Sequence, residues 1–238
     1  MNELEVTPPS AFSATAGATA ERVTAFLRKV YGWMFVGLGI TATVALGVSS
    51  SPAIVQALVQ NKLLFWGLFL GELGLVFYLS ARVAKISPAT ASGLFLLYSA
   101  LNGVTLSLIL LMYTGTSIAT TFAVTAGMFG ALALYGTTTK RSLAGVGQFM
   151  FMGLIGLVLA SVVGMFVKSD GLQFVISVVG VLVFTGLTAW DAQRLKAMAV
   201  AVPEGRTGSY AVVGALALYL DFINLFLFLL RFLGGRRD

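Results

Sequence analysis

The chain has neither a histidine nor a cysteine in its 238 residues. The lack of cysteine excludes disulfides, thiol catalysis and thiolate metal sites. The lack of histidine removes the Ser-His and Cys-His nucleophile pairs, the commonest zinc ligand and the usual side chain for sensing pH near neutrality. Any such sensing must therefore use carboxyl groups.

Charged residues are also scarce, because 10% of the sequence is charged and 58% is hydrophobic. A soluble domain carries about 25% charged residues, so this chain has too little polar surface to cover a water-soluble globule. The composition predicts an all-α integral membrane protein in contact with the lipid bilayer. The net charge of +6 does not indicate nucleic-acid binding, because the basic residues occur singly or in pairs between apolar runs, as in membrane-protein loops.

Seven apolar runs are each near the length of about 20 residues that a membrane helix needs. They cover residues 31–48, 63–81, 88–112, 117–135, 146–167, 172–193 and 209–233. Short stretches rich in Ser, Thr, Pro or Gly separate them, for example Ser-Ser-Ser-Pro at 49–52. We expect one domain, residues 22–238, folded as a seven-helix bundle.

Residues 1–21 differ from the rest of the chain, because they are rich in Ala, Thr, Ser and Pro and carry only acidic charges. A secretory signal would have a basic start and a short apolar core. This segment has neither, so we expect a disordered cytoplasmic tail.

The distribution of Lys and Arg predicts a cytoplasmic N-terminus. The segments that would then lie inside hold Arg22, Arg28, Lys29, Arg82, Lys85, Lys140, Arg141, Arg194, Lys196 and Arg206. The outside loops hold Lys62 and Lys168, and the C-terminal Arg231, Arg236 and Arg237 would lie outside too, against the rule. Either the last run crosses the membrane fully, which its lack of proline favours, or it is re-entrant and returns the C-terminus to the cytoplasm.

The last run carries an acid near its middle. Small and polar residues follow 4-3-4-3 spacing on one face of this run, namely Tyr210, Gly214, Ala217, Asp221 and Asn224. Asp221 would lie roughly 16 Å into the membrane, where an Asp costs about 2.5–3.5 kcal/mol on insertion scales. The stripe suits a helix inside the bundle. A simpler alternative is that Asp221 only bonds helices together, through Asn224 or a Ser or Tyr of a neighbour.

A second acid, Asp191, ends the sixth run. Runs six and seven are consecutive and antiparallel, so Asp191 and Asp221 can meet in the cytoplasmic half of the membrane. Two carboxyl groups in one site share a proton and titrate as a unit, and they offer hard oxygen ligands to a cation such as Ca²⁺. The simpler alternative for Asp191 is an interfacial ion pair with Arg194, one turn further on.

A third acid, Glu72, lies near the middle of the second run, and Arg82 ends that run. Arg82 is the basic residue best placed to pair with Asp191, although it could equally be a positive-inside anchor, and Glu72 could serve a local salt bridge. The third run has a polar stripe comprising Tyr98, Asn102 and Thr105. This stripe either lines a polar cavity or bonds helices together, and the second is favoured.

Two stretches resemble the paired signatures of the Bax inhibitor family of transmembrane proteins. They are Leu-Thr-Ala-Trp-Asp-Ala-Gln-Arg-Leu-Lys at 187–196 and Leu-Tyr-Leu-Asp-Phe-Ile-Asn-Leu-Phe at 218–226. The resemblance extends to the seven-run layout, the acid in run two and the basic residue at its end. The family usually has Tyr before the run-six Asp, where this chain has Trp190, so a hydroxyl is lost beside Asp191.

The resemblance implies a seven-helix bundle with the last helix central, in a bacterial inner membrane. It implies a pH-sensitive calcium leak in which Asp191 and Asp221 share a proton and Arg82 latches the closed state. Some bacterial relatives bind and modulate a membrane protease, and eukaryotic relatives restrain cell death.

Three functions therefore compete. The first is a non-enzymatic leak for Ca²⁺ gated by protons at Asp191 and Asp221. The second is a modulator that docks on a membrane protease or another membrane protein. The third is an intramembrane aspartyl protease, which is disfavoured because Asp221 follows Tyr-Leu, with no Gly nearby to open its helix to substrate.

Overall fold

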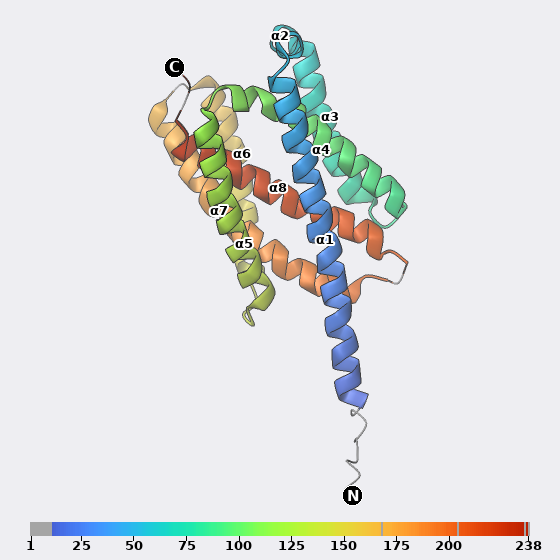
Figure 1. Cartoon of the computed structure of the whole chain (residues 1–238). Helices are drawn as coiled ribbons and strands as arrows, with labels where there is room; N and C mark the ends of the chain where they lie inside the picture. Colours follow the sequence, from blue (N-terminus) through green and yellow to red (C-terminus); the bar gives the residue numbers. More distant parts are fainter. Residues whose placement is uncertain (1–10, 168, 204, 236, 238) are drawn as a thin grey trace, which may run out of the picture.

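The structure is a computed structural model that describes residues 11–167, 169–203, 205–235 and 237 (Figure 1). This part of the chain is built from eight α-helices. They are α1 Ala11–Ser49, α2 Pro52–Gln60, α3 Lys62–Arg82, α4 Pro88–Leu111, α5 Gly115–Thr138, α6 Ala144–Phe166, α7 Asp170–Ala201 and α8 Thr207–Leu233.

Seven of these helices, all except α2, are long and apolar enough to cross a membrane. This confirms the all-α, seven-span prediction. The nine-residue α2 was not predicted, because only the Ser-Pro break before it was recognised. Pro52 stands in the first turn of α2, where its fixed φ favours a helix start and its missing N–H leaves no bond unmade.

Helix α1 begins at Ala11, well before the first apolar run. The tail expected over residues 1–21 is therefore helical from Ala11 onwards, and residues 1–10 lie outside the described part of the chain. Alanine occupies positions 11, 14, 16, 18 and 20, and its high helix propensity explains why a polar segment continues the helix.

The start of α1 and the end of α8 lie at opposite faces of the bundle (Figure 1). Helix α8 is continuous over its 27 residues, and the chain after it is tied to the α4–α5 connection. The Thr114 N–H donates to the Gly235 carbonyl at 3.2 Å, the Arg237 N–H to the Met112 carbonyl at 3.0 Å, and the Gly235 N–H to Ser117 Oγ at 2.9 Å. Helix α8 thus has no break at which the chain could turn back, and a full crossing stays the prediction that its sequence favours. Below, the face where α1 begins is called the N-terminal face.

Helix α8 crosses the molecule obliquely behind α1 (Figure 1) and packs against α1, α3, α4, α5 and α7. Of its most apolar stretch 67% is buried, against 11% for α3 and α6. Helices α3 and α6 therefore present most of their surface to lipid, while α8 lies within the protein.

Two glycines let neighbouring helices approach α7 closely. A Cβ on Gly136 of α5 would overlap the carbonyl oxygen of Ala189, and a Cβ on Gly147 of α6 would overlap the Trp190 ring. Both contacts flank Asp191, so α5 and α6 close around this part of α7.

Candidate functional site

The structure brings Asp191 and Asp221 together where α7 packs on α8. Their side chains interact directly, and the two residues are only 9% and 5% exposed. Asp221 Oδ2 is buried and has no hydrogen-bond partner among the described residues. A buried acceptor without a donor is unusual, and a proton held between the two carboxyl groups would satisfy it. We call these two residues the aspartate pair.

Arg194 is the basic partner of the aspartate pair. Its Nη1 lies 3.3 Å from Asp191 Oδ1, and its side chain is 53% exposed. The positive charge of Arg194 also acts on Asp221. The ion pair with Arg194 and the contact between the acids therefore exist together, although they were weighed as alternatives from the sequence.

Trp190 holds Arg194 in place. The Arg194 guanidinium lies over the Trp190 ring, 5.4 Å from its centroid, and the ring packs against Gly147 of α6. Trp190, which stands where the resemblance leads us to expect Tyr, thus supplies a flat ring face that attracts the cation. The sequence showed this substitution but not its contact, because only the fold places Gly147 beside the ring.

Gln193 and Lys196 were not recognised as site residues from the sequence. The Gln193 side chain accepts from the Leu143 N–H at 2.8 Å and donates to the Arg141 carbonyl at 2.8 Å. Lys196 Nζ donates to the Thr137 carbonyl at 2.8 Å. Gln193 therefore joins the α5–α6 connection to α7, and Lys196 joins the last turn of α5 to α7. The sequence feature that could have identified them is their position within two helical turns of Asp191.

Arg82 lies at the end of α3 and is exposed. Its side chain forms no ion pair within the described ranges, where Asp191 pairs with Arg194 instead. The latch between Arg82 and Asp191 stays a prediction about another conformation.

Glu72 belongs to a different polar group. It is 7% exposed and accepts from Asn102 Nδ2 at 3.2 Å and from Thr105 Oγ1 at 3.0 Å. Tyr219 Oη donates to Asn102 Oδ1 at 3.0 Å and lies 2.6 Å from Thr41 Oγ1. This network, which joins α1, α3, α4 and α8, uses Glu72 as an acceptor for neutral donors, without a salt bridge.

The other supporting residues pack close by. The Tyr98 ring meets the Tyr219 ring edge-on, with centroids 5.7 Å apart. The Asn224 amide donates to the Leu220 carbonyl of its own helix at 2.8 Å. Asn224 therefore bonds within α8, and the stripe on α4 bonds helices together, as the sequence favours.

The site can contact a cation but is poorly equipped to hold one. Bound Ca²⁺ takes about six to eight oxygen ligands. No group of three or more acidic residues that could hold a metal occurs in the described part of the chain. Two carboxyl groups alone supply fewer ligands than such an ion takes.

A cavity of about 450 Å³ with a mixed polar and apolar lining opens at the opposite face, between the ends of α4, α7 and α8. Its polar lining comprises Asp170, Gln173, Ser177, Tyr113 and Arg231. Between this cavity and the aspartate pair lies an apolar cluster that includes Phe184, Leu187 and Leu225. This cluster separates the two polar regions in the present conformation.

A bundle of seven apolar spans, with two buried acids in contact between the last two helices, defines a polytopic membrane protein with a carboxyl pair inside its core. Residues 23–238 match the family described as "Inhibitor of apoptosis-promoting Bax1". The chain belongs to this family, which confirms the resemblance carried by the motifs around Asp191 and Asp221.

Bacterial relatives share most of their length with this chain. "Inner membrane protein YbhL" of Escherichia coli K12 is 51% identical over 215 residues, which cover 89% of this chain and 92% of that protein. An uncharacterized protein of Borreliella burgdorferi is 48% identical over 215 residues, covering 90% and 93% of the two chains. "Uncharacterized protein RP147" of Rickettsia prowazekii is 42% identical over 214 residues, covering 90% of each.

Proposed function

We propose that this protein is a pH-sensitive leak for Ca²⁺ in a bacterial inner membrane, with its N-terminal face in the cytoplasm. The observation that carries the proposal is the contact between two buried aspartates, of which Asp221 keeps an unpartnered oxygen. Membrane helices rarely retain such groups without a use in ion or proton movement.

Protons control the leak through the charge of the aspartate pair. The described groups whose charge acts on the pair are the two carboxyls themselves and Arg194. While the pair is ionised it attracts an arginine, which is Arg194 in this structure and Arg82 in the latched state. Protonation removes the charge that holds the arginine, so α3 and α7 are free to move at the N-terminal face. Flux should therefore rise as pH falls.

The apolar cluster between the pair and the outer cavity completes the mechanism. Ions cannot cross the packed side chains of Phe184, Leu187 and Leu225 without a separation of α7 from α8. The present conformation is closed at this cluster but lacks the Arg82 latch, and the outer cavity is the vestibule on the far side of the closure.

Calcium flux into liposomes that contain the pure protein tests this function. We expect wild-type flux to depend on pH, and the double substitution Asp191→Asn with Asp221→Asn to abolish that dependence. Glu72→Gln, which removes a buried carboxyl group from the separate network of Asn102 and Thr105, controls for the loss of any intramembrane acid. Undiminished pH dependence in the double variant would overturn the mechanism.

We propose no proteolytic activity. Asp191 and Asp221 both lie inside continuous helices, whose closed backbone leaves no extended segment beside them to receive a peptide substrate. Cleavage of a model transmembrane peptide that is lost on Asp221→Asn would contradict this statement.

A further inference from the structure

An apolar groove runs between α1 and α5 on the outside of the bundle. Its volume is about 340 Å³. Its floor is formed by the buried side chains of Met34, Phe129 and Phe222, while Phe35 and Leu134 on its walls are 67% and 65% exposed. We call it the α1–α5 groove. In a membrane its exposed walls face lipid chains.

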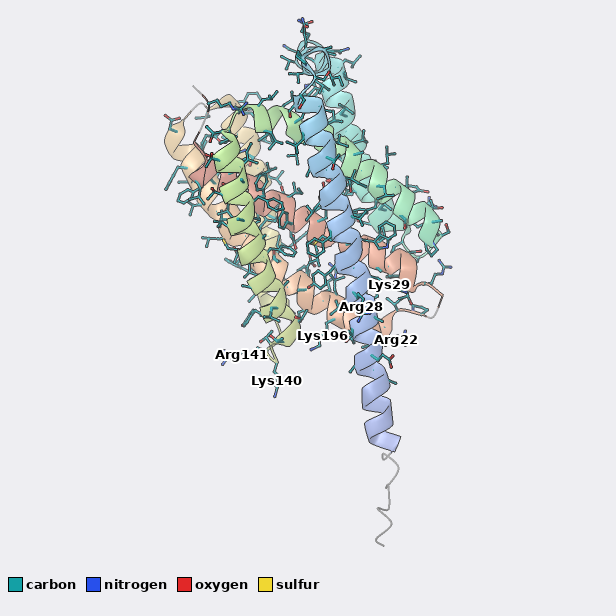
Figure 2. The ribbon with its side chains drawn as sticks, viewed as in Figure 1. Arg22, Arg28, Lys29, Lys140, Arg141 and Lys196 are labelled. Carbon is teal, nitrogen blue, oxygen red and sulfur yellow. The ribbon has the colours of Figure 1, made fainter. Side chains whose placement is uncertain are left out.

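The groove ends at a cluster of cations. Thr137 is its last residue on α5, and Lys196 Nζ donates to the Thr137 carbonyl at 2.8 Å. On α1, Arg28 precedes the groove residue Tyr31 by three positions. It therefore lies on the same side of that helix and about 4.5 Å closer to the N-terminal face of the bundle. In the view of Figure 2, Lys196 lies between the lower end of α5 and α1, Arg28 lies on α1, and Lys140 and Arg141 lie below α5.

The positive charge at this end exceeds the negative charge around it, because Asp191, five residues before Lys196 on α7, is already paired with Arg194. The acidic residue nearest to it along α1 is Glu21, two turns beyond Arg28, or about 10 Å further along the helix. Arg28, Lys140, Arg141 and Lys196 are all exposed and have no ion pair within the described ranges. A ligand that fits must place an anion at this cluster and an apolar chain in the groove.

We propose that the α1–α5 groove binds one anionic phospholipid of the leaflet at the N-terminal face. One acyl chain lies on Met34, Phe129 and Phe222, and the phosphate binds to Arg28 and Lys196. Tyr31 stands at the boundary between them, the level at which tyrosine is enriched in membrane proteins. The positive-inside rule accounts for the cations but not for an apolar groove that ends among them. This proposal does not depend on the leak.

Native mass spectrometry of the full-length protein tests the site, with phosphatidylglycerol and phosphatidylcholine of identical acyl chains as probes. We expect selective retention of phosphatidylglycerol. Arg28→Gln and Lys196→Gln should each reduce it about fivefold. The matched control is Lys29→Gln with Lys85→Gln, which removes two charges from the same face; Lys29 points away from α5 in Figure 2. The control should retain wild-type binding.

A second pair of variants tests the apolar part. Gly130 lines the groove, and a Cβ there meets no atom within 4 Å, so Gly130→Leu fills the groove without strain. Gly127 is equally open but lies outside the groove, so Gly127→Leu is its control. We expect only Gly130→Leu to release phosphatidylglycerol.

Several outcomes would overturn the proposal. One is equal retention of the two lipids, and another is equal loss in the charge variants and their control, which would show a general surface effect. Unchanged binding in Gly130→Leu would mean that no chain occupies the groove. A dimer that forms in place of the lipid complex and is lost in Gly130→Leu would assign the groove to a second copy of this chain.

Discussion

Among the described residues Asp191 has one cationic partner, and that partner lies over an aromatic ring. Arg194 reaches Asp191 Oδ1 at 3.3 Å while its guanidinium lies over Trp190. A cation–π contact of this kind contributes about 0.5–1 kcal/mol at an exposed site, and a half-exposed ion pair contributes about 0–1 kcal/mol. The two contacts together keep a flexible side chain beside the aspartate pair.

This arrangement gives a prediction that separates the two arginines. Arg194→Gln removes a cation in contact with the pair, so protons should bind the pair more readily and the pH midpoint of calcium flux should move up, by less than about one unit because Arg194 is half exposed. Trp190→Leu should give a smaller shift in the same direction. Flux measured in liposomes against pH checks both.

Arg82→Gln is the matched comparison, because Arg82 does not touch the pair in this conformation. If Arg82 latches the closed state, its loss should raise flux at every pH. A midpoint that stays in place in Arg194→Gln and moves in Arg82→Gln would contradict the assignment of Arg194.

At the scale of residues, the sequence predicted which acidic side chains matter better than it predicted the partners that they contact. The insertion cost of an acid singled out Asp221 and Glu72 without any structure. The partners of Glu72, the ring beneath Arg194 and the bonds of Gln193 depend on which helix faces meet, and single-helix periodicity does not contain that information.

At the scale of elements, the packing of α5 on α7 holds the aspartate pair in place. Gly136 of α5 meets the backbone of Ala189, two residues before Asp191. Gln193 of α7 then bonds the α5–α6 connection, and Lys196 of α7 bonds the end of α5. A contact of backbone against backbone cannot be relieved by a side-chain rotation.

Gly136→Ala should therefore destabilise the protein by about 1–3 kcal/mol, the usual effect of overpacking a tight contact. Gly127→Ala on the same helix is the control, because a Cβ there meets nothing within 4 Å and alanine has the higher helix propensity. Thermal unfolding in detergent measures both. Equal unfolding midpoints for the two variants would mean that α5 is not fixed on α7 at Gly136.

The helix boundaries show which elements a sequence can predict. The ends of α3, α4, α6 and α8 fall close to the ends of the apolar runs, because the membrane sets the length of each run. The start of α1 and the end of α7 extend beyond their runs. Those stretches lie where helix propensity and contacts with neighbours decide the structure, and hydropathy does not report on either.

At the scale of the whole molecule, charge is distributed unequally between the two faces. Ten described Lys and Arg residues belong to the N-terminal face, namely Arg22, Arg28, Lys29, Arg82, Lys85, Lys140, Arg141, Arg194, Lys196 and Arg206. The opposite face has Lys62, Arg231 and Arg237 in the described ranges. Figure 2 shows several of the first group around the lower ends of α1, α5 and α7. The positive-inside rule thus favours a cytoplasmic N-terminal face.

The C-terminus should then lie outside, even though it is basic. Its backbone is bonded to the α4–α5 connection through Gly235 and Arg237, so the C-terminal arginines stay on the face opposite to α1's start. Six preceding spans have already fixed the orientation by the time this segment is inserted, and late charges act weakly against them.

An alkaline phosphatase reporter, which is active only outside the cytoplasm, tests this orientation when fused after Asp238. We expect high activity there and low activity when the same reporter follows Lys140 in the α5–α6 connection. The opposite pattern would place the aspartate pair in the outer half of the membrane, where the pH that it senses would be that of the cell exterior. An active reporter at Lys140 would therefore contradict cytoplasmic pH control of the proposed leak, while leaving the contact between Asp191 and Asp221 unaffected.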